Sequence, residues 1–330
     1  MQNTFTLDLH THRNEMKVPP REYWGQVESI GIDAIAITEH AHISPREAFE
    51  ALYPLTPEQK VLIPGAELNT MHGHVLVYAK TPELYEVKEL FQKDVSIEKV
   101  LEIAKENGFL LTIPHPWGFN YDSFGYNMGI EKLEQLVMGN EIGVEAYNGM
   151  IGHLSNFVYG SGIVKKPVNF LDFLEKNRIA IKTRVSGIGS RLKKKIDDKR
   201  LDIVERCSKA LDLGEKASFI TAGSDAHSAK RIGLGILKIK SDETKLTIDN
   251  VFEILRQKEN VVWSGPLVKE ISPGEYRKVN EPWKARELLQ GIRYSASSVI
   301  RRSGKRIGRK IRKKIGGSSI KKKIGNLVSK

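Results

Sequence analysis

The chain has 330 residues, 40% of them hydrophobic, which is enough for one large barrel domain or two domains of ordinary size with a substantial core. Its single cysteine, Cys207, excludes an internal disulfide and suits a reducing compartment. No uncharged apolar run is long enough to cross a bilayer, and the first residues lack the pattern of a signal peptide. These features predict a cytoplasmic protein with no transmembrane segment.

The net charge of +12 is a property of the C-terminus. Residues 301–330 contain thirteen Lys or Arg and no acidic residue, so the first 300 residues carry 39 basic and 40 acidic side chains. The body of the protein is therefore nearly neutral, and attraction to a polyanion is expected from the tail.

Alternating and apolar runs predict strands at residues 5–9, 33–37, 61–63, 74–79, 109–113, 142–147, 178–182, 218–222 and 260–263. Amphipathic stretches predict helices at residues 22–30, 96–107, 130–138, 170–177, 201–213 and 246–257. Because strands and helices alternate, we expect a parallel α/β barrel rather than an all-β or all-α fold.

The segment 153–214 is long for one connection, which predicts an insertion beside the mouth of a barrel that spans residues 1–240. Residues 241–287 are expected to form a C-terminal extension packed on the barrel, and residues 288–330 a basic amphipathic tail.

Histidines and carboxylates follow several of the apolar runs. His10 and His12 are two positions apart in a strand, so both imidazoles project from one face and can share an ion, although an isolated His-x-His is weak evidence. Asp225 and His227 form a second such pair after the run 219–222, where Gly223 permits a tight exit from the strand. Two such pairs favour a shell of nitrogen and oxygen ligands for Zn, Mn or Fe.

Four further motifs lie between the two pairs: Ile37-Thr38-Glu39-His40, Ile63-Pro64-Gly65-Ala66-Glu67, Gly73-His74-Val75-Leu76 and Ile113-Pro114-His115-Pro116. The ordered set resembles the PHP family, the polymerase and histidinol phosphatase superfamily of metal-dependent phosphoesterases, over roughly residues 5–240. The resemblance implies a distorted (β/α)7 barrel with two or three divalent metal ions at its C-terminal face.

The same resemblance implies which side chains hold each ion. One ion would be held by His10, His12, Glu67 and Asp225. Glu67 would bridge to a second ion held by His74 and His115, and a third would be held by His40 and His227. The catalytic groups would be a metal-bound water with Glu39 and His40 beside it.

The sequence departs from the family's pattern at two positions. Family members usually place Asp or His a few residues beyond the His-x-His pair, where this chain has Glu15, whose additional methylene partly restores its reach. Glu39 replaces the more usual Asp before His40, where a carboxylate that orients an imidazole is the natural assignment.

A phosphate dianion needs cationic partners, and arginine can grip two phosphate oxygens together. The candidates for contact with the substrate are Arg13, Glu145, His153, Arg184, Arg191, Lys230 and Arg231. For each cation a solvated surface position is an equal alternative, and for Glu145 and His153 so is a structural role.

In the tail, Ile300, Ile307, Ile311 and Ile315 recur at helical spacing among Lys and Arg, which predicts an amphipathic basic helix. An anionic membrane surface uses both the cations and the apolar stripe, whereas nucleic acid needs only the cations. We therefore expect the tail at the inner membrane surface, with nucleic acid as the second possibility and a solubilising end as the third.

Together these features predict a cytoplasmic, metal-dependent phosphoesterase in which metal-activated hydroxide hydrolyses phosphomonoesters, nucleotides or oligonucleotides. An amidohydrolase-like barrel that cleaves C–N bonds is one alternative, since such enzymes also use His-x-His and a late Asp. A catalytically decayed module that binds lipid or nucleic acid is the other.

Overall fold

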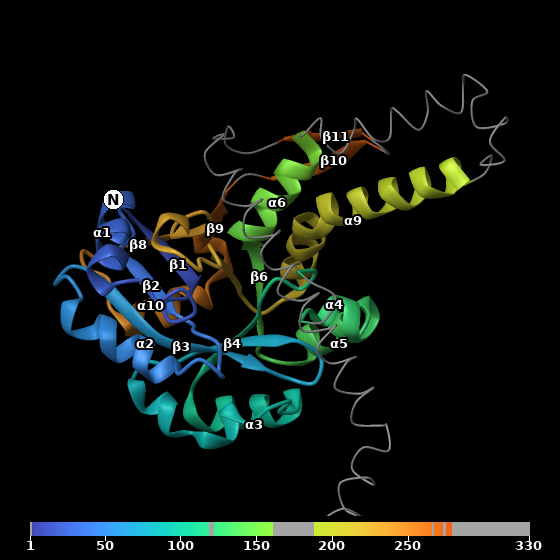
Figure 1. Cartoon of the computed structure of the whole chain (residues 1–330). Coiled ribbons are helices and arrows are strands. Elements are labelled where there is room, and N and C mark those ends of the chain that lie inside the picture. Colours follow the sequence, from blue (N-terminus) through green and yellow to red (C-terminus); the bar gives the residue numbers. More distant parts are fainter. Residues whose placement is uncertain (1, 119–121, 161–187, 266, 273–274, 279–330) are drawn as a thin grey trace, which may run out of the picture. The chain divides into compact units, whose positions relative to one another are not determined.

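The computed structural model describes residues 2–118, 122–160, 188–265, 267–272 and 275–278 (Figure 1). The strands are β1 (Asn3–Thr11), β2 (Ala34–Ile37), β3 (Val61–Asn69), β4 (His74–Tyr78), β5 (Leu110–Ile113), β6 (Gly143–Asn148), β7 (Ile220–Gly223), β8 (Ile236–Ser241), β9 (Val261–Ser264), β10 (Val268–Ser272) and β11 (Glu275–Lys278). The first nine form one sheet in the order β7-β6-β5-β4-β3-β2-β1-β8-β9, and β10 pairs with β11. The predicted helix 170–177, the predicted strand 178–182 and the tail 288–330 lie outside the described residues.

The helices are α1 (Pro20–Ile30), α2 (Pro45–Leu52), α3 (Ile97–Asn107), α4 (Phe124–Asn127), α5 (Ile130–Gly139), α6 (Gly149–Gly160), α9 (Ile188–Lys216) and α10 (Ile248–Leu255). Short 3-10 turns occur at η1 (Tyr53–Leu55), η2 (Pro82–Glu86), η3 (Lys88–Phe91), η4 (Ala229–Arg231) and η5 (Lys258–Asn260). Local sequence sets several helix ends: the Ser96 hydroxyl accepts a hydrogen bond from the Lys99 amide, and Thr247 and Asn250 form a capping box.

The ends of the sheet approach each other closely enough to make a nearly closed barrel. Thr11, at the end of β1, forms a parallel bridge with Ala226, just beyond β7. The His12 amide donates to the Ala226 carbonyl at 2.9 Å, and the Asp225 amide donates to the His10 carbonyl at 2.8 Å. The expected α/β barrel is confirmed in this form, and its closure brings the two metal-competent pairs of the sequence together.

The expectation of an all-parallel barrel is wrong for β4, which runs antiparallel to both β3 and β5. The connection from β3 is a tight turn in which Thr70 and Gly73 are hydrogen-bonded at 2.9 Å, too short for the crossover helix that a parallel pair requires. Gly73 has φ +156°, and a Cβ there would lie 2.8 Å from the Phe124 ring. The reversed strand places His74 beside the end of β3.

Elements that the sequence patterns did not predict include α2, α6 and β8. β8 pairs antiparallel with β1 on one side and with β9 on the other, and its side chains alternate between buried and exposed. α9 also begins before the predicted helix 201–213, and both α6 and α9 overlap the predicted insertion 153–214.

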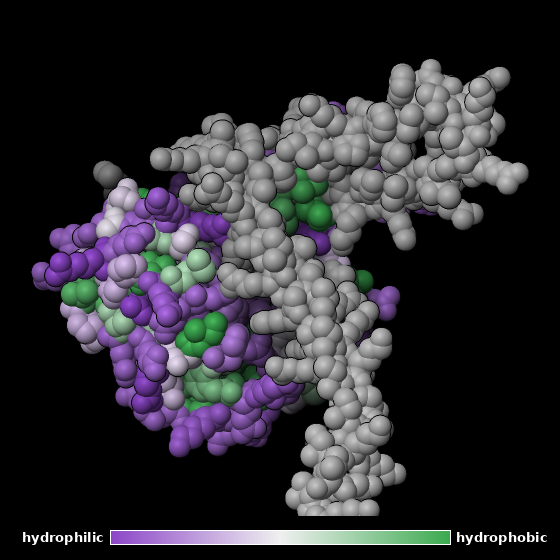
Figure 2. All heavy atoms as spheres, viewed as in Figure 1, coloured by the Kyte–Doolittle hydropathy of each residue, from purple (hydrophilic) through white to green (hydrophobic). Residues whose placement is uncertain are grey.

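The core lies on both sides of the strands, as period-two alternation requires. On β2, Ile35 and Ile37 pack with Val27 of α1 in one hydrophobic cluster, while Ala34 and Ala36 belong to a second cluster. α1, α2 and α3 lie along the outside of the strands (Figure 1). The described surface is mainly hydrophilic on the face shown in Figure 2. Among the described residues, no helix combines the length and apolar character of a membrane span.

Candidate metal centre

His10, in β1, and His12, one residue beyond its end, enter the barrel from the same face. His10 and His12 are buried and their Nε2 atoms lie 3.2 Å apart. Thr11, between them, points the other way, and its hydroxyl contacts the Tyr23 hydroxyl and the Ala36 carbonyl, both at 2.6 Å. The alternation expected from the sequence therefore holds at this strand end.

Glu67, near the end of β3, lies at the centre of the site. Its Oε1 is 2.6 Å from His74 Nδ1 and 3.1 Å from His115 Nε2. Its Oε2 is 2.6 Å from His40 Nδ1 and 3.6 Å from His12 Nε2. Burial opposes ionisation of Glu67, but the surrounding imidazoles, first that of His74, outweigh it and hold the pKa of this carboxyl well below its usual value.

Asp225 reaches the site from the segment after β7. Its Oδ1 is 3.5 Å from His12 Nε2 and 3.8 Å from His10 Nε2. Burial again opposes ionisation, yet the neighbouring His10 and His12 hold the pKa of Asp225 well below its usual value. The close approach depends on Gly223, because a Cβ at that position would lie 2.3 Å from the Cβ of His10.

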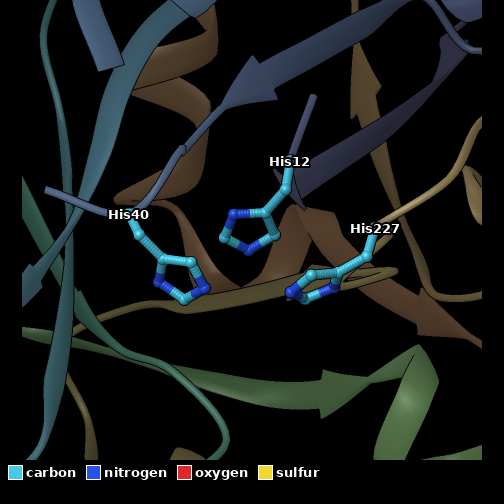
Figure 3. A group of neighbouring side chains, drawn as sticks. All are labelled: His12, His40 and His227. Atoms are coloured by element: carbon cyan, nitrogen blue, oxygen red, sulfur yellow. The ribbon is translucent and has the colours of Figure 1, made fainter. Parts of the chain in front are cut away.

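Three imidazoles, those of His12, His40 and His227, point toward one another (Figure 3). His227 stacks on His12 with ring centroids 4.4 Å apart. The Glu15 carboxylate joins this group, with Oε2 at 2.9 Å from His227 Nε2 and 3.8 Å from His40 Nε2. The hydrogen bond from His227 lowers the pKa of Glu15 to about 2.

These side chains fit bound cations. Within the described part of the chain, four groups have ligand atoms within 4.8 Å of one another: His12, His40 and His227; His10, His12 and Glu67; His10, His115 and Asp225; His40, Glu67 and His74. His40 Nδ1 and Glu67 Oε2 are buried without hydrogen-bond partners although they lie 2.6 Å apart. When the His40 proton is on Nε2, its Nδ1 faces the carboxylate with an electron pair, and a cation bound by both groups would relieve that repulsion; the imidazole and carboxylate set suits Zn, Mn or Fe.

Two of these residues have strained backbones. His115 has φ +30° and Asp225 has φ +52°, in the region that non-glycine residues rarely adopt. Strain of this kind clusters at functional sites, where surrounding contacts maintain it. At His115 those contacts include a hydrogen bond from the Gly118 amide to the His115 carbonyl at 2.7 Å, and Arg206 Nη1 in turn donates to the Gly118 carbonyl at 2.5 Å.

A second ring of carboxylates supports the histidines from behind. Glu39 Oε1 lies 3.4 Å from His12 Nδ1, and its Oε2 accepts hydrogen bonds from the amides of Arg13 and Asn14 at 2.9 and 2.5 Å. Burial opposes ionisation of Glu39, but the His12 contact prevails and lowers its pKa to about 2. The imidazole beside the Glu39 carboxylate is that of His12, since consecutive residues in an extended chain point to opposite sides.

Glu145 occupies the corresponding position behind His10. Its Oε1 is 2.9 Å from His10 Nδ1, and its Oε2 accepts from the His115 amide at 2.8 Å and from Asn148 Nδ2 at 2.9 Å. Its carboxylate is fully buried and both oxygens are engaged. These contacts favour the structural role that the sequence left open for Glu145 beside substrate contact.

The remaining predicted substrate contacts differ in their surroundings. His153 on α6 is buried, which lowers the pKa of its imidazole to about 4 despite a hydrogen bond to the Leu234 backbone. Arg231 lies near enough to His153 to add to this shift, and Lys230 beside it is exposed. Arg13 is half-buried, with Nη1 2.5 Å from Asn14 Oδ1. Arg184 and the Arg191 side chain lie outside the described part of the chain.

Asp8 and Asn148 were not identified from the sequence. Asp8 is buried, and its carboxylate accepts hydrogen bonds from the amides of Ser224 and Gly233 at 2.8 and 2.9 Å. Burial raises the pKa of Asp8 to about 6. The only local signal was a polar residue inside the apolar run 5–9, on the opposite side of β1 from its neighbours Leu7 and Leu9.

Neither the models of protein families nor the curated proteins include a match to this sequence. Solved structures do include similar chains. The crystal structure of PsfC from Pseudomonas syringae PB-5123 has a TM-score of 0.52 at 14% identity, covering 89% of this chain and 99% of that chain.

Two further similar structures are more distant. A two-domain protein from Bacteroides vulgatus ATCC 8482, described as containing a predicted PHP-like metal-dependent phosphoesterase, has a TM-score of 0.48 at 16% identity, with 82% and 73% of the two chains covered. The lesion-specific endonuclease PfuEndoQ from Pyrococcus furiosus has a TM-score of 0.46 at 13% identity, with 80% of this chain and 59% of that chain covered. At these identities the likeness is one of fold alone.

Proposed function

We propose that the chain is a PHP-superfamily, metal-dependent hydrolase of phosphate esters. The observation that carries this proposal is the position of Glu67, whose carboxylate lies within 3.8 Å of nitrogen atoms from five histidines. Packing of a structural core does not require a buried carboxylate to lie among so many imidazoles, whereas a ligand shared between cations does. In this proposal the barrel that carries the site is a distorted (β/α)7 barrel, formed by β1 to β7 with β4 reversed.

The proposed ligands divide among two or three ions. His10, His12, Glu67 and Asp225 hold one; Glu67, His74 and His115 hold a second; His40 and His227, with Glu15, hold a third. Burial is the main reason that the pKa of His40 is lowered, which leaves its imidazole neutral at pH 7 with an electron pair for ligation. Divalent cations bound here would neutralise phosphate oxygens and make a water molecule more acidic.

The chain's own side chains would supply orientation and charge around the ester. Glu39 and Glu145 fix the rings of His12 and His10 by accepting from their Nδ1 atoms, which directs the Nε2 atoms inward. Arg13, Lys230 and Arg231 follow or flank ligand residues and are the proposed cationic contacts for a phosphate.

Purified protein reconstituted with Mn or Zn should hydrolyse phosphomonoesters or short oligonucleotides, measured as released phosphate or shortened product. Glu67→Gln, which removes the central charge, should lower the rate by at least about 100-fold, as loss of a metal ligand typically does. The exposed Glu22→Gln is the matched control. Cleavage of amide substrates in place of phosphate esters would support the amidohydrolase alternative, and no hydrolysis by the metal-loaded protein would reject the proposal.

We also propose that residues 288–330 bind an anionic membrane surface, so that a cytoplasmic enzyme works at the inner face of a membrane. The support is sequence: thirteen cations after residue 300 are interleaved with isoleucines, at about 1 kcal/mol of attraction per cation near such a surface. Sedimentation with vesicles containing phosphatidylserine should require this tail. Equal binding to neutral vesicles, or binding to duplex DNA alone, would contradict this assignment.

A further inference from the structure

Asn148, the last residue of β6, lies between two buried carboxylates. Its Nδ2 donates to Glu145 Oε2 at 2.9 Å and approaches Asp225 Oδ2 at 3.3 Å. Its Oδ1 accepts from the Ile151 amide at 3.1 Å, which caps the first turn of α6. Asn148 is 3% exposed, so the amide makes these contacts inside the protein.

The contact with Asn148 gives the two oxygens of Asp225 different surroundings. Oδ1 faces Nε2 of His12 at 3.5 Å and Nε2 of His10 at 3.8 Å, whereas Oδ2 accepts from Asn148. A carboxylate can ligate a cation through one oxygen or through both. Because Oδ2 already has a donor, Oδ1 is the oxygen left to face the centre of the site.

The second contact acts through Glu145. Asn148 and the His115 amide both donate to Glu145 Oε2, which leaves Oε1 to accept from His10 Nδ1 at 2.9 Å. A hydrogen bond at Nδ1 fixes the tautomer and the plane of an imidazole whose Nε2 is to serve as a ligand. One amide is thus connected to two neighbouring ligands, to Asp225 directly and to His10 through Glu145.

We propose that Asn148 is a positioning residue of the metal centre, which restricts Asp225 to ligation through one oxygen and holds the His10 ring in its ligating orientation. The inference rests on the proposed metal-dependent function and assigns Asn148 no contact with substrate. It predicts that loss of the amide changes the number of oxygens that Asp225 contributes, and with it the affinity and the geometry of the bound ion.

Asn148→Ser is the informative variant, because serine also caps helices but is too short to reach both carboxylates. Metal-free wild type and variant would be titrated with Co(II) and Mn(II), with binding followed by calorimetry and by the visible absorption of Co(II). We expect about 10- to 100-fold weaker binding of at least one ion, the usual effect of removing a partner of a metal ligand. We also expect altered Co(II) bands, which loss of a merely structural contact would not produce.

Thr247→Ala is the matched control, since it removes a helix cap of α10 and should lower stability by about 1 kcal/mol without changing metal binding. Asn148→Thr, which retains a capping hydroxyl, repeats the test if the serine variant does not fold. Wild-type affinity and an unchanged Co(II) spectrum in a folded Asn148 variant would overturn the inference. Failure of the wild type to bind either ion would instead reject the proposed function on which it rests.

Discussion

The carboxylate of Glu15 lies 2.9 Å from Nε2 of His227, joining the loop after β1 to the loop after β7. Glu15 therefore takes the place beside the third group of imidazoles that the sequence comparison with the PHP pattern suggested. The extra methylene of glutamate is sufficient for this reach. His40 lies 3.8 Å from the same oxygen, so one carboxylate faces two of the three histidines.

Glu15→Ala should weaken one metal site and leave the others intact. The variant keeps the three imidazoles but loses the Glu15 carboxylate, whose Oε2 lies 2.9 Å from His227 Nε2. The Asp225 carboxylate lies farther from His227, with Oδ1 at 3.5 Å from Nδ1. We expect about 10- to 100-fold lower affinity for one ion and unchanged affinity for the rest. Metal content after dialysis against a graded series of chelator concentrations measures this, with the exposed Glu22→Ala as the control. Loss of every ion together would show that Glu15 does not serve a separate site.

Gly223→Ala should destabilise the fold by roughly 2–4 kcal/mol, because overpacking forces the backbone apart. The added Cβ would lie 2.3 Å from His10 Cβ and 2.5 Å from its amide nitrogen, at the junction that closes the barrel. Gly25→Ala in α1 is the control, since no atom lies within 4 Å of its Cβ and alanine favours a helix by about 0.5–1 kcal/mol. Urea unfolding of the metal-free proteins compares the two. Equal urea midpoints for the two variants would show that β1 and the end of β7 can move apart at this junction without loss of stability.

His153 should make stability fall as the solution is acidified. Its pKa is about 4 in the folded protein and 6.5 as the ordinary value, so between these values the unfolded chain binds the proton and the folded chain does not. The contribution of His153 to the free energy of unfolding is fully present above pH 6.5. As the pH falls toward 4, the free energy of unfolding decreases on this account by on the order of 3 kcal/mol. The difference in urea unfolding free energy between wild type and His153→Leu, both metal-free, should show this slope. A difference that stays constant from pH 7 to pH 4 would contradict it.

Cys207 should resist alkylation in the native protein. Burial raises the pKa of its thiol to about 12, so almost no thiolate exists at pH 8 and the sulfur is inaccessible as well. Mass spectrometry after iodoacetamide treatment should find native protein unmodified and urea-unfolded protein modified once. Met138→Cys, at a side chain that is 68% exposed, supplies a reactive control in the Cys207→Ala background. Rapid labelling of native wild type would show that α9 opens readily.

Residues that act through local alternation could be predicted from the sequence. His10 and His12 share a face because strand side chains alternate, and Asp225 and His227 follow an apolar run that ends at the same rim. The reversal of β4 could not be predicted from periodicity, because a buried strand has the same pattern in either direction. The short turn before His74 was the available signal, since four residues cannot hold a crossover helix.

The hydrogen bonds that support the metal-competent side chains could not be predicted from the sequence, because they join segments that are far apart in the chain. Asp8 accepts from Ser224 and Gly233, and nothing near Asp8 in the sequence points to either partner. The sequence predicted that Glu39 orients an imidazole but did not name which one, and extended geometry turns adjacent side chains apart and places Glu39 beside His12. A carboxylate next to a histidine in an extended segment is better sought as the partner of a different histidine.

The bridge between Thr11 and Ala226 also has a consequence for biosynthesis. Because His10 and Asp225 meet only when this bridge forms, a nascent polypeptide has an incomplete ligand set until residue 227 has left the ribosome. Ion capture by the proposed centre then follows the emergence of residue 227 and reports closure of the barrel, so metal supply would govern a late step of maturation rather than the early folding of the chain.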